Sequence, residues 1–235
     1  VCLTIRDIVS IEPNGGLKPH LVFAQWIRSL HCNRNCPVEI FTTNYDLLFE
    51  KAMEQVGVPF FDGFVGSVAP FFIPEAVEAD ESKDSESVYP PRTWTRFWKV
   101  HGSINWFVQK ENSSGYRERI TRLSGINQQA GDELMIFPSR EKYSQSRKLP
   151  FIALQDRLRR FISNGEMLLV ILGYSFSDEH LNDIMLQGLR SNPRLAISAF
   201  MFDPLTEELI RYAKEYRNLT LYGPDKICIG GLVSL

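Results

Sequence analysis

The sequence predicts an α/β protein with a doubly wound, parallel, Rossmann-like sheet. Short apolar or β-branched runs, typical of buried strands, alternate with segments whose apolar side chains recur at helical spacing. This alternation occupies both ends of the chain, and parallel strands joined by helical crossovers explain it. The 235 residues, 44% of them hydrophobic, are enough for one domain that carries an insertion.

The N-terminal part contains three predicted elements. A helix is expected over 17–30, where aromatic and aliphatic residues share one face. A strand over 38–43 (VEIFTT) follows, because the run is short, β-branched and mostly apolar. Directly after it, 48–56 has an apolar residue every fourth position until Gly57 ends the pattern, which predicts a second helix.

The C-terminal part continues the same rhythm. Its predicted elements are a helix at 154–162, a strand at 167–173, a helix at 181–189, a strand at 195–202, a helix at 209–216 and a strand at 219–222. The strands at 167–173 and 195–202 are almost wholly apolar, so we expect the first to be buried on both sides and the second to be a buried strand too. Ser175 or Ser177 is expected to cap the helix that follows the first of them.

Between residues 60 and 149 the alternation breaks. This segment contains an acidic, serine-rich run at 78–87 and an aromatic-dense run at 94–107. We therefore expect a small inserted lobe over 60–149, with 1–59 and 150–235 together forming the Rossmann-like domain. The acidic run is expected to be a solvated loop.

Polar clusters follow three of the predicted strands, at the edge where parallel sheets bind ligands. They are Thr42–Asp46, Gly173–Asp178 and Asp203–Pro204. Helix capping alone explains each cluster equally well. However, Asn44 and Asp46 bracket an aromatic residue at a joint that needs only one cap, and Gly173 would allow a ligand close to the backbone.

A fourth cluster lies inside the predicted lobe, at Lys99–Trp106 (KVHGSINW). His101 followed by Gly102 can serve as a general base near neutral pH, with the glycine leaving room for a substrate. The alternative is a core histidine held by hydrogen bonds. The other three histidines lie at ends of predicted helices without such surroundings.

Composition excludes several classes of protein. Lysine and arginine number 26 against 28 aspartate and glutamate, which gives no global attraction to nucleic acid or to anionic membranes. No apolar run approaches the ~20 residues of a membrane span, and the first residues do not resemble a signal peptide. Four scattered cysteines favour a reducing compartment, so a cytoplasmic location is expected.

The strings FTTNYD, KVHGS and LGYSFSDEH, in this order, resemble the SIR2-like family of sirtuin-related, NAD-consuming domains of bacterial defence proteins. The resemblance covers 38–204. The sirtuin motif T-Q-N-I-D matches Thr42, Asn44 and Asp46, although Thr43 and Tyr45 depart from it. The sirtuin histidine base corresponds to His101, and the G-T-S segment that approaches the cofactor corresponds to residues 173–175 (GYS).

Two departures from sirtuins bear on the function. No cysteine lies between Cys36 and Cys228, so the structural zinc module of the deacylases is absent and no metal is expected; Cys32 and Cys36 lack a second pair. Without that module, the resemblance favours hydrolysis of NAD+ itself. Furthermore, nothing before Pro37 reads G-x-G, so we expect a Gly-rich phosphate-binding strand outside this chain, or another means of holding the pyrophosphate.

The resemblance therefore implies an NAD+ glycohydrolase that releases nicotinamide and ADP-ribose, with NAD+ as substrate. Asn44 and His101 would be catalytic. The residues expected to contact NAD+ are Thr43, Asp46, Gly102, Gly173, Tyr174, Ser175 and Asp203. The alternatives are an NAD-dependent protein deacylase and a non-catalytic module that binds NAD or ADP-ribose.

The resemblance also implies a biological setting. Uncontrolled NAD+ loss would be toxic, so the chain is expected to be the effector of an anti-phage, abortive-infection system that is held inactive until infection is sensed. A homo-oligomer is expected, with a sensor, ATPase or Argonaute-like protein as a possible partner subunit. Neither membrane attachment nor direct nucleic-acid binding is expected of this domain.

Overall fold

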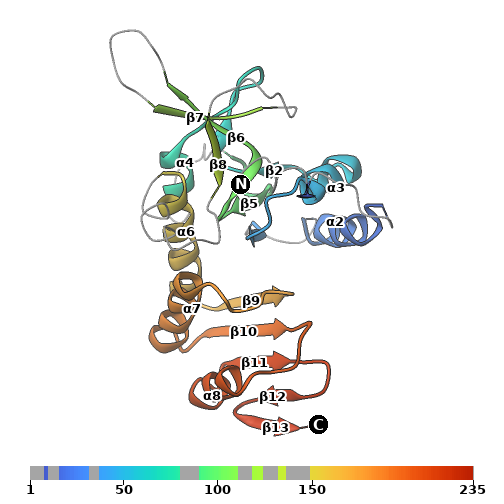
Figure 1. Cartoon of the computed structure of the whole chain (residues 1–235), viewed down its shortest axis with the longest axis vertical. Helices are drawn as coiled ribbons and strands as arrows, with labels where there is room; N and C mark the ends of the chain where they lie inside the picture. The colour runs from blue at the N-terminus through green and yellow to red at the C-terminus, as the bar shows by residue number, and fades with distance from the viewer. Residues whose placement is uncertain are drawn as a thin grey trace. The chain divides into compact units, whose positions relative to one another are not determined.

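The computed structural model describes residues 8–9, 16–31, 37–79, 90–110, 118–123, 132–135 and 149–234. It confirms the predicted α/β class, with strands and helices alternating at both ends of the chain. The chain divides into two compact units (Figure 1). We call Val1–Leu154 the N-terminal unit and Gln155–Leu235 the C-terminal unit, and describe each by itself.

The N-terminal unit contains a parallel sheet of three strands, β1 (Glu39–Thr42), β5 (Thr95–Lys99) and β2 (Phe60–Phe61). β5 lies in the centre, between β1 and β2. β1 and β5 are in register over four residues, so that both strands end at the same edge of the sheet. All five residues of β5 are buried.

Two helices pack against this sheet, α2 (Lys18–His31) and α3 (Leu48–Val56). Both lie where the sequence predicts them. Their apolar faces share a core with Phe97 of β5, which is 1% exposed. α3 ends at Gly57, whose φ of +77° lies in the left-handed region that favours glycine.

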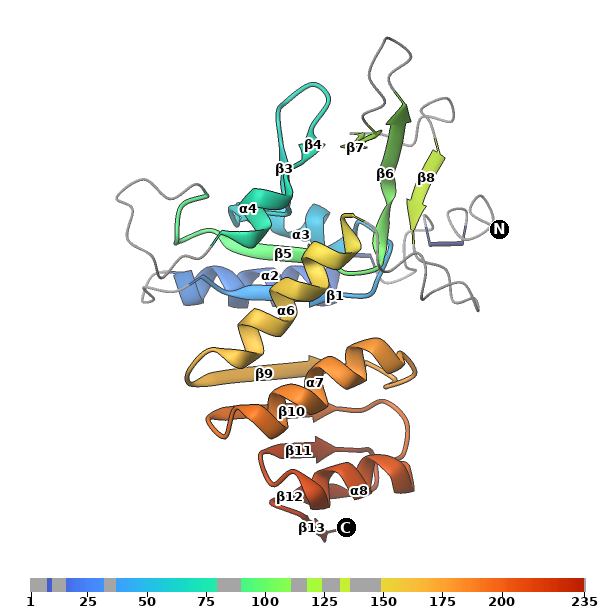
Figure 2. The same cartoon turned by 90° about the vertical axis from the view of Figure 1, so that its left-hand side faces the viewer.

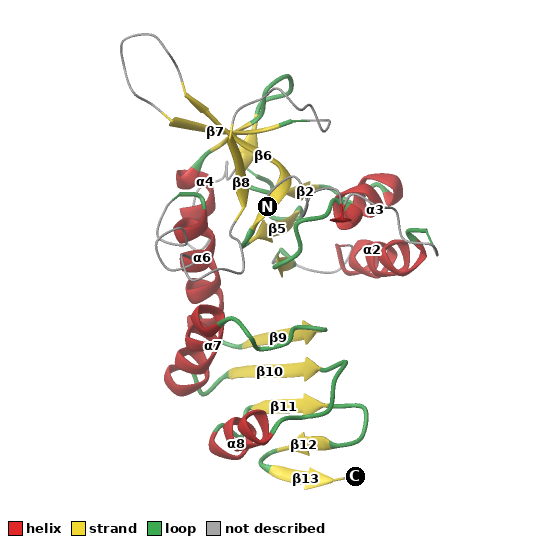
Figure 3. Ribbon diagram, in the orientation of Figure 1, coloured by secondary structure: helices red, strands yellow, loops and turns green. Residues whose placement is uncertain are grey.

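A second, antiparallel sheet also belongs to the N-terminal unit (Figure 3). Its strands, in spatial order, are β3 (Phe64–Val65), β4 (Phe71–Phe72), β7 (Glu118–Arg122), β6 (Gly102–Lys110) and β8 (Asp132–Met135). A short helix, α4 (Pro74–Glu78), follows β4. The segment 60–149 thus supplies β2 and β5 to the parallel sheet and these five strands to the antiparallel one.

The C-terminal unit contains one five-stranded sheet. Its strands are β9 (Met167–Leu172), β10 (Leu195–Phe200), β11 (Leu219–Tyr222), β12 (Ile227–Ile229) and β13 (Leu232–Ser234). β9, β10 and β11 are parallel, as predicted, whereas β12 and β13 add an antiparallel edge. The helices are α7 (Glu179–Ser191), α8 (Glu207–Glu215) and, from Gln155 onward, α6 (Phe151–Ser163), which precedes β9 and begins within the N-terminal unit.

The strands of the C-terminal unit are less buried than predicted. α7 and α8 cover one face of the sheet (Figure 2), and alternate residues such as Ile197 and Leu221 are buried. On β9, however, Leu168, Val170 and Leu172 are 60%, 45% and 60% exposed. The expectation of a strand buried on both sides is therefore wrong, because alternate side chains point to opposite faces and α7 and α8 lie against only one of them.

Among the described helices, none combines the length and the apolarity needed to cross a lipid bilayer.

Candidate functional site

The carboxyl ends of β1 and β5 bring two of the predicted clusters together. Thr42, the last residue of β1, lies opposite Lys99, the last residue of β5. The loop that leads from β1 to α3, residues 43–47, is here called the Asn44 loop. Its Tyr45 carbonyl accepts a hydrogen bond from the backbone N–H of Ile104, at 3.1 Å. The segments FTTNYD and KVHGS, which are distant in sequence, therefore lie side by side at this edge of the sheet.

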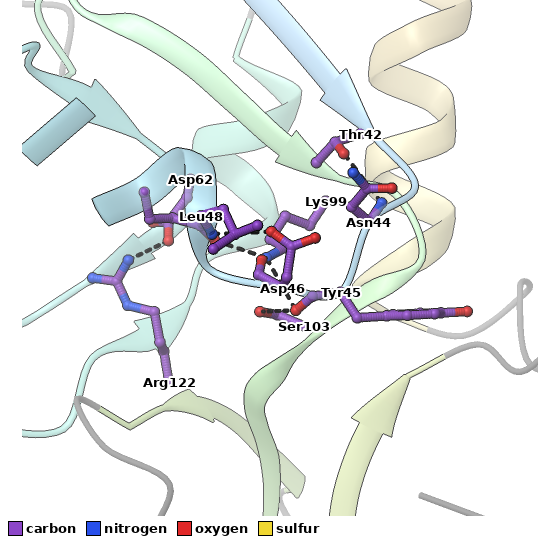
Figure 4. A network of polar contacts seen from close by, with 10 residues as sticks. Thr42, Asn44, Tyr45, Asp46, Leu48, Asp62, Lys99, Ser103 and Arg122 are labelled. Atoms are coloured by element: carbon purple, nitrogen blue, oxygen red, sulfur yellow. Dashed lines mark hydrogen bonds and ion pairs between the residues drawn. The ribbon is translucent and has the colours of Figure 1, made fainter. Parts of the chain in front are cut away.

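Within the Asn44 loop, Asn44 and Asp46 have different surroundings (Figure 4). Asp46 accepts a hydrogen bond at 3.0 Å from the N–H of Leu48, the first residue of α3, although the N-cap position itself is occupied by Leu47, whose side chain makes no capping hydrogen bond. The backbone N–H of Asn44 donates to the Thr42 hydroxyl at 3.1 Å. Its side chain is exposed and makes no hydrogen bond to another described residue. The hydrogen bond at the start of α3 therefore accounts for Asp46, but it does not account for the side chain of Asn44.

His101 lies at the turn between β5 and β6, where the chain passes from the parallel to the antiparallel sheet. It is 9% exposed, and its ring centroid is 6.5 Å from that of Tyr45, with the planes tilted by 33°. The next residue, Gly102, has a φ of +91°, which a side chain would strain. Gly102 is therefore a backbone requirement of this turn as well as part of the candidate site.

Lys99 and Glu50 form an ion pair at this edge that sequence reasoning missed. Lys99 Nζ is 2.7 Å from Glu50 Oε1, and their side chains are 2% and 14% exposed. Burial raises the pKa of Glu50, and this effect outweighs the lowering of the same pKa by the positive charge of Lys99. The sequence did contain a signal, since a lysine within an aromatic-dense strand segment must find a buried partner.

The C-terminal unit holds the third cluster, at the carboxyl end of β9. Gly173 donates its N–H to the Phe200 carbonyl at 3.0 Å, and its φ of +64° favours glycine. A side chain there would meet no atom within 4 Å, so the space beside this residue is open. Ser175 is exposed, and its hydroxyl lies 2.8 Å from that of Ser177.

The Tyr174 side chain, by contrast, is engaged within its own unit. Its hydroxyl lies 3.1 Å from the carbonyl of Asp178 and 3.1 Å from Oδ1 of Asn182. Burial, together with the charge on Asp178, raises its pKa. Because the Tyr174 hydroxyl is engaged in these contacts, the backbone of Tyr174 is better placed than its side chain to contact a ligand.

The cap of α7 differs from the prediction. Asp178 accepts hydrogen bonds from the N–H groups of His180 and Leu181, at 3.1 and 3.3 Å. Neither Ser175 nor Ser177 has this role, because the helix begins only at Glu179 and the residue directly before it is Asp178.

Asp203 is exposed and follows the end of β10, which pairs with β9 so that Phe200 lies opposite Leu172. The loops after β9 and β10 therefore share one edge of the sheet. The predicted site residues thus form two groups. The N-terminal unit holds Thr43, Asn44, Asp46, His101 and Gly102, and the C-terminal unit holds Gly173, Tyr174, Ser175 and Asp203.

Within the described ranges, no group of three or more histidine, cysteine, aspartate or glutamate side chains is placed to hold a metal ion. Cys32 and Cys36 lie outside the described residues.

Comparison with known proteins identifies the family to which the chain belongs. A family model described as "SIR2-like domain" matches residues 38–222, which are 185 of the 235 residues. No curated protein matches the chain. The matched range includes all three predicted motifs, the ends of β1 and β5 and the edge formed by β9 and β10. The chain therefore belongs to the SIR2-like domain family, with a Rossmann-type α/β fold and an association with NAD-related chemistry.

Proposed function

We propose that the chain is an NAD+ glycohydrolase, which breaks the bond between nicotinamide and ribose with water and yields nicotinamide, ADP-ribose and a proton. Membership of the SIR2-like family supports NAD+ as the substrate. The observation that carries the proposal is that the Asn44 loop and the turn with His101 both follow the shared carboxyl edge of β1 and β5, with the ring centroids of Tyr45 and His101 6.5 Å apart. An exposed amide and a histidine there suit a reaction that orients water.

The chemistry needs little acid catalysis at the leaving group. Nicotinamide leaves as a neutral molecule from a cationic ring, so the protein must mainly orient the nucleophile and accept its proton. In our proposal the Asn44 amide holds the attacking water or the nicotinamide ribose. His101 accepts a proton from water or from a ribose hydroxyl, a role that typically contributes about 10² to 10⁴ in rate.

The remaining assignments concern binding. We assign Asp46 to the shape of the nicotinamide pocket through its place in the Asn44 loop, and Thr43 and Gly102 to contacts with NAD+ beside it. For the C-terminal unit, we propose that the backbone at Gly173 and Tyr174 and the exposed Ser175 hydroxyl bind phosphate or ribose. The positive φ and open space at Gly173 support this assignment. Asp203 is proposed on the adenosine side.

The biological role is part of the same proposal. We propose a cytoplasmic effector of an anti-phage, abortive-infection system, whose hydrolysis of NAD+ stops the host cell. Such an activity must be held off before infection, so a homo-oligomer, or a separate sensor, ATPase or Argonaute-like subunit, would control it. Enzymatic measurements must therefore be made in the activated state.

The direct test measures nicotinamide released from NAD+ by purified protein, together with any trigger it requires. N44A and H101A are each expected to lose activity by a factor of at least about 10², the lower range of general-base effects. N164A is the matched control. Asn164 is also exposed, but it precedes the amino end of β9, whereas Asn44 follows the carboxyl end of β1. Activity in N44A and H101A equal to that of N164A would remove both residues from the mechanism.

The alternatives give different outcomes in the same assay. A protein deacylase would release nicotinamide only when an acylated peptide is added, and would form O-acyl-ADP-ribose. A binding module would bind NAD+ or ADP-ribose without cleavage in any assembly state.

A further inference from the structure

A buried ion pair adjoins the Asn44 loop, and its contacts reach further than the pair itself. Lys99 ends β5, and Glu50 lies in the first turn of α3. Burying two opposite charges removes both from water, and their mutual attraction offsets this cost only in part. The pair is thus weak evidence of stabilisation, and the other contacts of Lys99 indicate what it does.

The Lys99 ammonium has three N–H donors, and three acceptors lie within hydrogen-bonding distance of it. One acceptor is Glu50 Oε1, at 2.7 Å. The other two are backbone carbonyls of the Asn44 loop, that of Tyr45 at 3.3 Å and that of Asp46. All three donors are therefore used, and two of them hold the backbone immediately after Asn44.

Further hydrogen bonds support the same segment. The Tyr45 carbonyl also accepts from the Ser103 hydroxyl, at 3.3 Å, and from the N–H of Ile104. On the other side of Asn44, the Thr42 hydroxyl accepts from the N–H of Asn44 itself. The backbone is thus held on both sides of a residue whose side chain is exposed.

Lys99 is also fixed with respect to His101. Both belong to one short stretch of chain, the end of β5 and the turn that follows it, and are separated only by Val100, which is 1% exposed. The Val100 N–H donates to the Thr42 carbonyl at 3.0 Å. One side chain thereby links the backbone beside Asn44 to the strand that leads into His101.

We infer that Lys99 is a positioning residue, which holds Asn44 in place relative to His101 through the carbonyls of Tyr45 and Asp46. The inference rests on the proposed NAD+ hydrolysis, because it assumes that Asn44 and His101 act on the same substrate. Lys99 itself is buried, so it acts through the loop and does not contact the substrate.

The decisive comparison is between E50Q and the double variant E50Q/K99M. Both lack the buried carboxylate, so neither suffers from an unpaired negative charge. In E50Q the ammonium keeps its two carbonyl acceptors, whereas in E50Q/K99M an apolar chain of similar length replaces it. We expect kcat for nicotinamide release to be about 10- to 100-fold lower in the double variant, the size of effect typical of a misplaced reacting group.

The KM for NAD+ is expected to change by less than about twofold between these variants, because the inference concerns orientation more than uniform binding. E50Q/K99R is the rescue variant, since a guanidinium can again donate to carbonyls. It should recover part of the lost kcat. A kcat that simply follows the melting temperature, with no rescue by arginine, would mean that Lys99 is only structural.

Hydrogen exchange measured by mass spectrometry provides a readout that does not need activity. The amides of Asn44 and Leu48 should exchange faster in E50Q/K99M than in E50Q, while a peptide from α2 stays unchanged. Equal exchange in the Asn44 loop overturns the positioning role, whatever the activity. If the activated wild-type protein releases no nicotinamide, the proposed function fails, and the exchange experiment still decides whether Lys99 holds the loop.

Discussion

Replacing Lys99 with methionine, with Glu50 left in place, should destabilise the protein strongly and in a pH-dependent way. The change removes the contact of 2.7 Å to Glu50 and two hydrogen bonds to loop carbonyls. The second oxygen of Glu50 is already buried without a partner among the described residues, so nothing described there can compensate. Breaking a buried pair in this way typically costs about 3 to 5 kcal/mol. Domains of this size are stable by about 5 to 15 kcal/mol, so the loss is large.

The pH dependence follows from the carboxyl group that remains. In the wild type, burial raises the pKa of Glu50 above its ordinary value of 4.5, with a smaller contribution from the charge on Asp62, although Lys99 lowers it. K99M removes the positive charge that lowers the pKa of Glu50, so this pKa rises further. The folded variant then binds more protons than the folded wild type between the two pKa values. The difference in unfolding free energy therefore grows with pH in that window, by up to about 1.4 kcal/mol per pH unit.

Urea unfolding, followed by tryptophan fluorescence at several pH values from about 5 to about 8, measures this difference. We expect K99M to approach the wild type at the acid end, where Glu50 is protonated in both proteins. The pair E50Q and E50Q/K99M is the control, because neither has the carboxyl group at position 50, and their difference should stay flat. A wild-type to K99M difference that is independent of pH, or below about 1 kcal/mol at pH 8, would contradict a buried, charged Glu50.

Three further outcomes are expected. D178A should lower the unfolding free energy by about 1 kcal/mol because it removes the cap of α7, whereas S177A should change it by less than about 0.5 kcal/mol; urea unfolding distinguishes the two. G173A should cost about 1 to 2 kcal/mol from its positive φ alone, since a Cβ there meets no atom within 4 Å, and calorimetry of NAD+ binding would show whether the loop matters for the ligand. N44A should keep the wild-type melting temperature while losing nicotinamide release, because its side chain is exposed.

Local patterns predicted the alternating helices and parallel strands on either side of the segment 60–149. The strand at β1 and the helices α2 and α3 follow from residues that are neighbours in sequence, since helical and strand periodicity depend only on which face of an element is buried. The same holds for the alternation from α6 to β11. The ordered motifs at the strand ends predicted the family as well, and the match over 38–222 confirms it.

Details of the elements were harder to predict. Between residues 175 and 178, serine and aspartate have similar intrinsic preference for a helix cap, so the choice of Asp178 depended on where the helix begins. A run of apolar residues does not indicate whether one face of the sheet or both are covered by helices. It therefore could not predict that Leu168, Val170 and Leu172 are exposed.

The sequence by itself determined the α/β class, the family and the loops in which the candidate residues lie. Only the tertiary structure decided that β5, some 50 residues after β1, pairs beside it and brings His101 to the Asn44 loop. It also decided that Lys99 meets Glu50 and two loop carbonyls in a buried place. Such pairings depend on register and burial between distant segments, and local periodicity carries no information about which segments meet.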